Sequence, residues 1–194
     1  MELTGERSIP ASRARTWEAL NDTEVLKACI AGCESLEREG DDGMLATVAI
    51  KVGPVSARFK GKLKLSDMQP PESYTIHFDG QGGVAGFGKG SAQVSLVEAG
   101  PSTTTLKYTA KAQVGGKLAQ VGSRLVDAAA AKVAEDFFKA FEARLSEEAQ
   151  GAATGGAVVS LPVPVAQPKG DSLATLWWVV GITVSLVVLY FVLR

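Results

Sequence analysis

The segment from Lys117 to about Glu148 has the apolar spacing of one long amphipathic helix, and it constrains the fold more than any other part of the chain. Its apolar residues form two adjacent rows, one from Val121 to Leu145 and the other from Leu118 to Phe138. Together the rows make a broad apolar face, which needs a wide concave surface to cover it. The pattern therefore predicts a curved sheet packed against this helix.

The preceding residues supply such a sheet. Met1 to Pro10 is typical of a strand, residues 12–22 and 23–30 of two short helices, and about six one-sided strands follow. The clearest strand runs from Val55 to Leu65, where small and apolar residues alternate with basic ones. Antiparallel strands with one buried face alternate in this way. We expect an α+β fold in which an antiparallel sheet wraps around a long C-terminal helix.

The middle of the expected helix is built from small residues, Gly122 and Ala128 to Ala131, whereas Phe137, Phe138 and Phe141 lie near its end. Small residues opposite a curved sheet either leave an apolar ligand cavity or pack closely as good helix formers, and this helix alone favours neither. The residues expected to line such a cavity are apolar and share the inward face: Val48, Ile50, Phe59, Leu63, Ile76, Phe78, Phe87, Val94, Tyr108, Val121, Leu125, Ala129, Val133 and Phe137.

Charge gives a second candidate surface. The chain has 20 basic and 21 acidic residues, so no overall bias favours nucleic acid. A basic stripe lies on the outer face of the clearest strand: Arg58, Lys60, Lys62 and Lys64. Such a stripe is either a solvated edge or a contact with anionic lipid or an acidic partner.

No catalytic or metal site is expected. Gly83 to Lys89 reads G-x-x-x-x-G-K, but a strand pattern follows it, whereas a phosphate-binding loop needs a helix N-terminus. We predict a Gly-rich hairpin with apolar tips that gates a cavity or contacts lipid. His77 is the single histidine, and Cys29 and Cys33 are expected to be small apolar fillers.

Residues 173–193 carry no charge, and as a helix they would cover roughly 30 Å, the thickness of a bilayer core. We predict a single-pass, tail-anchored protein of the cell membrane, with the domain in the cytoplasm. The expected organisation is a domain at 1–148, a flexible Gly- and Pro-rich linker at 149–172 and a transmembrane anchor at 173–193.

Several segments together resemble one family. They are the helix Trp17-Glu18-Ala19-Leu20, the turn Gly32-Cys33-Glu34, the link Gly53-Pro54-Val55 and residues 116–125, which lead to Phe137-Phe138. The chain resembles the carbon monoxide dehydrogenase CoxG family, within the START-like helix-grip superfamily. The resemblance implies a non-enzymatic accessory protein that helps attach a molybdenum-containing CO dehydrogenase, or a related molybdenum hydroxylase, to the cytoplasmic membrane. It also implies a respiratory quinone, menaquinone or ubiquinone, in the helix-grip cavity.

Two alternatives remain open. One is a pure membrane scaffold, which needs no ligand and would tolerate larger residues at Ala130 and Ala134. The other is a cyclase-like enzyme acting on a hydrophobic substrate, which would need a buried acid or base facing the cavity.

Overall fold

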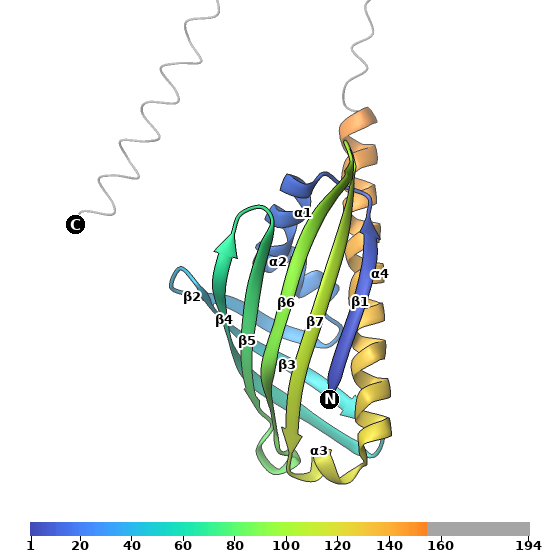
Figure 1. The fold of residues 1–194 in the computed structure, drawn as a ribbon. Helices are drawn as coiled ribbons and strands as arrows, with labels where there is room; N and C mark the ends of the chain where they lie inside the picture. The colour runs from blue at the N-terminus through green and yellow to red at the C-terminus, as the bar shows by residue number, and fades with distance from the viewer. Residues whose placement is uncertain (155–194) are drawn as a thin grey trace, which may run out of the picture. The chain divides into compact units, whose positions relative to one another are not determined.

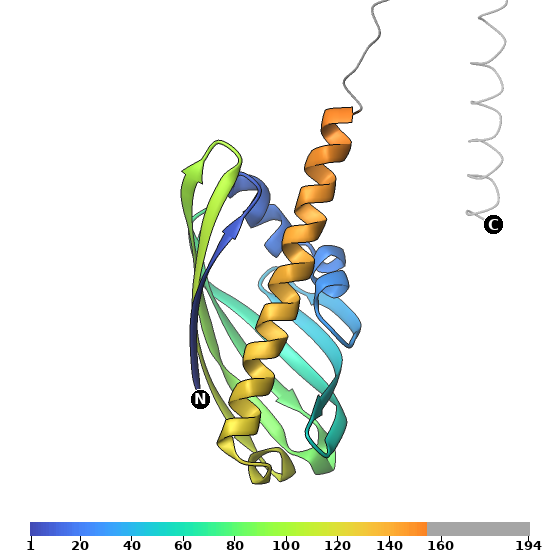
Figure 2. The same ribbon diagram turned by 90° about the vertical axis from the view of Figure 1, so that its right-hand side faces the viewer.

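Seven antiparallel strands form one curved sheet, and helix α4 crosses its concave side (Figures 1 and 2). The structure is a computed structural model, which describes residues 1–154 and the side chains of residues 1–150. The elements in chain order are β1 (Glu2–Ile9), α1 (Arg13–Leu20), α2 (Thr23–Cys29), β2 (Cys33–Glu39), β3 (Gly43–Val52), β4 (Val55–Gln69), β5 (Ser73–Gln81), the 3-10 helix η1 (Gly83–Ala85), β6 (Phe87–Gly100), β7 (Thr103–Gly115), α3 (Lys117–Gln120) and α4 (Ser123–Thr154).

The strand order is β1-β7-β6-β5-β4-β3-β2, with every neighbouring pair antiparallel. Each strand from β2 to β6 pairs with the next one along the chain, and β1 forms the far edge by pairing with β7. The expected order of one strand, two short helices, six strands and a long helix is confirmed.

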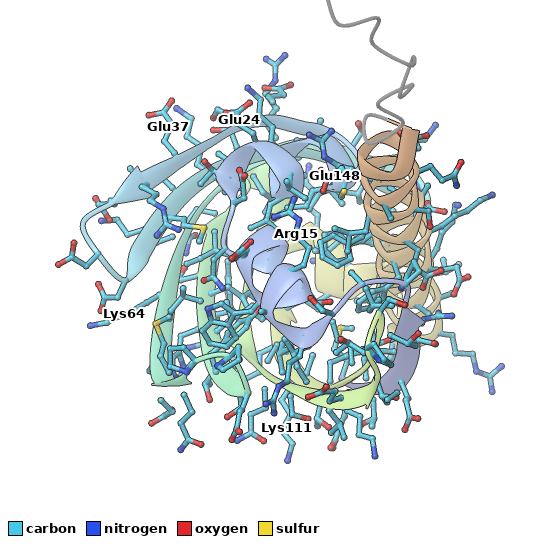
Figure 3. All side chains as sticks on the ribbon, turned by 90° about the horizontal axis from the view of Figure 1, so that it is seen from above. Arg15, Glu24, Glu37, Lys64, Lys111 and Glu148 are labelled. Carbon is cyan, nitrogen blue, oxygen red and sulfur yellow. The ribbon has the colours of Figure 1, made fainter. Side chains whose placement is uncertain are left out.

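The two short helices begin where the sequence places capping side chains. The Ser12 hydroxyl accepts a hydrogen bond from the Arg15 backbone N–H at 3.3 Å, and the Asp22 carboxylate accepts one from the Glu24 N–H at 2.8 Å. These caps satisfy N–H groups that have no partner within the helix. Arg15 of α1 also donates to Glu148 of α4 at 2.5 Å, and Figure 3 shows the two side chains pointing toward one another. This hydrogen bond raises the pKa of Arg15.

The long helix differs from the expectation in one respect. The prediction of a single helix from Lys117 was wrong, because Gly122 has a φ of 93° and interrupts it. Such a backbone conformation is readily adopted only by glycine. The short α3 is therefore separate, and α4 starts at Ser123 and continues past Glu148 to Thr154.

Buried side chains gather toward the two ends of the domain. Near α1 and α2, one cluster centres on Ile9, Leu106 and Phe141, and a second contains Leu36, Met44, Leu65 and Tyr74. At the end formed by η1 and α3, a third cluster contains Val52, Phe59, Ala85 and Leu118.

The expected anchor at 173–193 lies outside the described residues, as does the expected linker from residue 155 onward. Within residues 1–154, no helix is both long and apolar enough to span a bilayer.

Candidate functional site

A band of half-buried apolar side chains lies between the buried clusters. In register, Leu63 of β4 lies beside Phe78 of β5, and Ile76 lies beside Ala92 of β6. These residues alternate onto the face that α4 crosses, yet none of them is buried. In a closely packed interior, the middle of the sheet would be the most deeply buried part. The sheet and α4 therefore leave apolar surface accessible between the buried ends, although Leu63 and Ile76 also pack against the cluster that contains Leu65 and Tyr74.

The sequence explains where this space lies, because side chains become smaller across the sheet. One row of neighbouring inward positions runs Leu63, Phe78, Gly90, Ala112, and the next runs Leu65, Ile76, Ala92, Ala110. On α4, the half-buried Ala130 and Ala134 lie in the same row as the buried Val126 and Phe138. In these two rows, large residues lie on β4 and β5 and glycine and alanine lie on β6 and β7, while alanines occupy the middle of α4. This arrangement can accommodate an apolar molecule.

Few polar side chains lie beside this apolar band. Arg7 of β1 occupies an inward position and forms an ion pair with Glu135 of α4. Tyr108 stacks on Phe138 with ring centroids 5.2 Å apart, and Tyr74 packs edge-on against Trp17. Tyr74 is almost fully buried, which raises the pKa of its hydroxyl.

Most of the residues expected to line a cavity share the inward face. On the sheet these are Val48, Ile50, Phe59, Leu63, Ile76, Phe78, Val94 and Tyr108. Phe59 belongs to the buried cluster at the η1 end, and Val121 and Ala129 pack against that cluster. Phe137 packs against Phe138 and Phe141 at the other end.

Three of the expected lining residues lie elsewhere. Phe87 shares the outer face of β6 with Lys89 and is 38% exposed. Its ring covers Gly115, where an added Cβ would lie 2.3 Å from the ring. Leu125 and Val133 are 51% and 48% exposed, whereas Val126 and Phe138 in the adjacent row are buried. These three side chains do not face the apolar band.

The basic stripe lies on the outer face of β4, as expected, but three of its four cations have acidic partners. Arg58 pairs with Glu34 at 2.7 Å, Lys62 with Glu39 at 3.0 Å and Lys64 with Asp42 at 3.5 Å. Figure 3 shows Lys64 at the outer side of the sheet. Lys60 has no ion-pair partner among the described side chains. Most of this stripe is therefore neutralised by β2 and the turn that follows it.

Sequence reasoning missed Arg7, Tyr74, Ala92 and Ala110 as neighbours of the band. A signal for Arg7 was available, since it shares the alternation phase of Leu3, Gly5 and Ile9. Its positive charge suggested an outward side chain. The ion pair with Glu135 allows the side chain to lie on the inward face instead.

The described side chains offer little for acid-base or metal chemistry. The buried polar residues among them are Thr16 and Thr104, whose hydroxyls donate to the backbone carbonyls of Ser12 and Ala11 at 3.0 and 2.8 Å. His77 is exposed on the outer face and hydrogen-bonds Ser66 at 3.0 Å. Within the described part of the chain, no group of three potential ligands could hold a metal ion.

Two open grooves, of about 790 and 340 Å³, are lined mainly by residues on the outer face of the sheet. The first is bordered by charged and polar residues such as Glu2, Asp79 and Lys111. This first groove also includes Phe78, Gly90 and Ala112, which form one row of the band, so it runs beside the band at the edge of the sheet.

Comparison with known proteins agrees with this geometry. The model of the carbon monoxide dehydrogenase CoxG family matches residues 5–146. A conserved protein from Geobacillus kaustophilus is 30% identical, with a TM-score of 0.71 and coverage of 76% of this chain and 96% of that one. No curated protein is significantly similar in sequence.

Other solved structures are similar in fold at low sequence identity. A START superfamily protein from Mycobacterium smegmatis has a TM-score of 0.58 at 18% identity, covering 75% of this chain and 97% of that one. An aromatase/cyclase from a Streptomyces species has a TM-score of 0.61 at 12% identity, covering 78% and 97%. At these identities the likeness establishes the START-like fold alone.

Proposed function

The chain belongs to the carbon monoxide dehydrogenase CoxG family, and on that basis we propose that it is a non-enzymatic accessory protein of a molybdenum-containing CO dehydrogenase or a related molybdenum hydroxylase. In this proposal it recruits the enzyme to the cytoplasmic membrane and carries a respiratory quinone between the lipid and the enzyme. The observation that supports a carrier is the accessible apolar band between two buried ends.

The chemistry of the band suits a quinone. A quinone has a flat, largely apolar ring with two carbonyl oxygens and an apolar isoprenoid tail. Leu63, Ile76 and Phe78 offer apolar contact area, while the hydroxyl of Tyr108 offers a hydrogen-bond donor on the same face. Menaquinone and ubiquinone share these features, so both are candidate ligands.

The membrane part of the proposal rests on the sequence. Residues 173–193 are uncharged and long enough to cross a bilayer. An anchor there would hold the domain close to the lipid in which quinones dissolve.

A cyclase-like activity would require an acid or base buried beside the band. Thr16 and Thr104 are buried and donate to backbone carbonyls, and burial raises the pKa of the Tyr74 hydroxyl, which disfavours its ionised form as a base. A scaffold without a ligand would not require small residues along β6, β7 and α4. We therefore place the carrier first.

Mass spectrometry tests this function. The full chain is purified from membranes, extracted with organic solvent, and its lipid-soluble content is compared with authentic menaquinone and ubiquinone. We expect about one quinone per chain, as for a single occupied site. Extracts that contain phospholipid alone would overturn the carrier role.

Recruitment needs a separate measurement. Purified CO dehydrogenase is centrifuged with vesicles in the presence and absence of the full chain. We expect the enzyme to sediment with vesicles only when the chain is present. Equal sedimentation in both samples would contradict recruitment.

A further inference from the structure

One end of the domain collects cations that have no acidic partner. This surface, here called the basic end, includes η1, the turn between β3 and β4, α3 and the first turn of α4. Its cations are Lys51, Lys60, Lys89, Lys117 and Arg124. Within the described side chains none of the five forms an ion pair. Other cations of the sheet do form ion pairs, namely Arg58, Lys62, Lys64, Lys107 and Lys111.

The carboxylates near the basic end are fewer. Asp79 accepts a hydrogen bond from Gln81 at 3.0 Å, and Asp127 lies in the first turns of α4. Asp79 lies opposite Lys89 in register. Glu2, which pairs with Lys111, borders the same groove as these two residues. Six cations against three carboxylates leave this end with a local positive charge, although the whole chain is nearly neutral.

Exposed apolar side chains project from the same end. Val84, in η1, is 86% exposed, and Leu125, at the start of α4, is 51% exposed. An added Cβ on Gly53, in the β3–β4 turn, would lie 3.9 Å from Leu125, so these segments meet. A valine at this exposure has no partner in the domain.

The turn that carries Val84 is held in place. Its neighbour Ala85 is buried in the cluster with Phe59 and Leu118. The backbone of Gly86 lies against that of Gly116, where an added Cβ would lie 2.5 Å from the Gly86 Cα. The structure therefore presents Val84 from a fixed position, at the end of the domain that carries these cations.

We propose that the basic end docks on anionic phospholipid headgroups, with Val84 entering the bilayer interface. An exposed aliphatic side chain at an end rich in lysine suits a fluid anionic surface, because each cation near the surface strengthens binding to it about fivefold. The inward glycines Gly80 and Gly88 lie just behind this end, so docking brings the apolar band close to the lipid. This docking rests on the proposed function, because it requires that the domain is held at a membrane.

The anchored chain has enough length for this contact. Helix α4 has 32 residues, which makes it about 48 Å long. Residues 155–172, if fully extended, reach about 60 Å.

Fluorescence on the full chain tests the docking. An environment-sensitive dye is attached at Val84→Cys or at Val97→Cys, in a background where Cys29 and Cys33 are replaced by alanine and folding is verified by circular dichroism. Val97 is a matched control, since it is 50% exposed on β6 near the opposite end. The vesicles are phosphatidylcholine alone or an equal mixture with phosphatidylglycerol, and carry a quencher in the lipid.

We expect the dye at position 84 to be quenched in the mixed vesicles and at least fivefold less in phosphatidylcholine, with no quenching at position 97. Lys51→Gln with Lys117→Gln should weaken docking roughly 25-fold. The matched pair Lys27→Gln with Lys139→Gln, whose cations also form no ion pair among the described side chains, should leave it unchanged.

Four outcomes would overturn the docking: equal quenching at both positions, equal loss in both charge variants, a dye at position 84 that stays in water while the chain sediments with vesicles, or a dye that responds to CO dehydrogenase but not to vesicles. The last outcome would make the basic end a protein interface. A chain that does not sediment with vesicles at all contradicts the proposed membrane attachment. A chain that sediments while its dye stays in water contradicts only the docking.

Discussion

Arg7 on β1 forms an ion pair with Glu135 on α4, and its guanidinium carbon lies 5.7 Å from the centre of the Phe138 ring. The contact joins the first strand of the chain to its last described helix. Because β1 pairs with β7, the contact ties α4 to the β1 edge of the sheet.

This contact should stabilise the domain only modestly. The two side chains are 33% and 60% exposed, so solvent screens their attraction and we expect a coupling free energy of about 0.5 to 1 kcal/mol. A double-mutant cycle with Arg7→Met and Glu135→Gln measures it by denaturant unfolding. The coupling should fall at about 1 M salt, and a coupling unaffected by salt would argue against a screened ion pair.

Replacing Gly86 by alanine should destabilise the domain far more than the same change at Gly83. Gly86 has φ 113° and ψ −149°, and its added Cβ would lie 1.9 Å from the Gly115 carbonyl oxygen. Gly83 has φ 60° and open space around the added atom. We expect a loss of at least about 3 kcal/mol for Gly86→Ala and about 1 kcal/mol for Gly83→Ala. Equal unfolding free energies for the two variants would contradict the close backbone contact.

The two cysteines should react slowly in the folded chain. Burial raises the pKa of both Cys29 and Cys33 above the ordinary value of 9.0, and the thiolate is the reactive form. Alkylation by iodoacetamide should therefore be slower than in the unfolded chain, with Cys29, only 4% exposed, the slower of the two. Rates should keep rising above about pH 9. Labelling of Cys29 at the unfolded rate would refute this.

Tyr74 should make the domain less stable in alkali. Burial raises its pKa above the ordinary value of 10.0, so the folded state keeps the proton that the unfolded state releases. The stability associated with this group is fully present below about pH 10 and falls as pH rises, by up to about 1.4 kcal/mol per pH unit. Tyr74→Phe removes this dependence. Above that pH, the unfolding free energy of the variant should therefore rise relative to that of the natural chain. A constant difference between the two would show that the hydroxyl is not buried as described.

Much of the fold could be predicted because each strand has one inward face. The alternation from Val55 to Leu65 determines which side chains of β4 face α4, and the register with β5 extends this to Ile76 and Phe78. The same reasoning failed at Phe87, since the intervening 3-10 turn changes the count of residues between β5 and β6. A Gly-rich segment has no alternation of apolar and polar residues, so the sequence does not indicate which residues at the start of β6 face inward.

The orientation of the long helix could not be read from its sequence. Its two apolar rows are similar, so the choice between them depends on tertiary contacts. Tyr108 stacks on Phe138, and both rows contribute buried residues, Val126 and Phe138 from one and Phe141 and Leu145 from the other. Leu125 and Val133 lie at the side of the helix. The interruption at Gly122 was equally hidden, because glycine is compatible with both helix and turn.

The most direct test of the carrier is to fill the space beside the apolar band. Ala130→Leu with Ala134→Leu adds bulk on the half-buried side of α4, whereas Ala128→Leu with Ala131→Leu adds the same atoms on its exposed side. Quinone is measured per purified full-length chain, together with the melting temperature as a check of folding. We predict that the first pair lowers quinone content at least roughly tenfold and that the second leaves it unchanged. Equal quinone in both folded variants would contradict a carrier that binds its ligand between the sheet and α4.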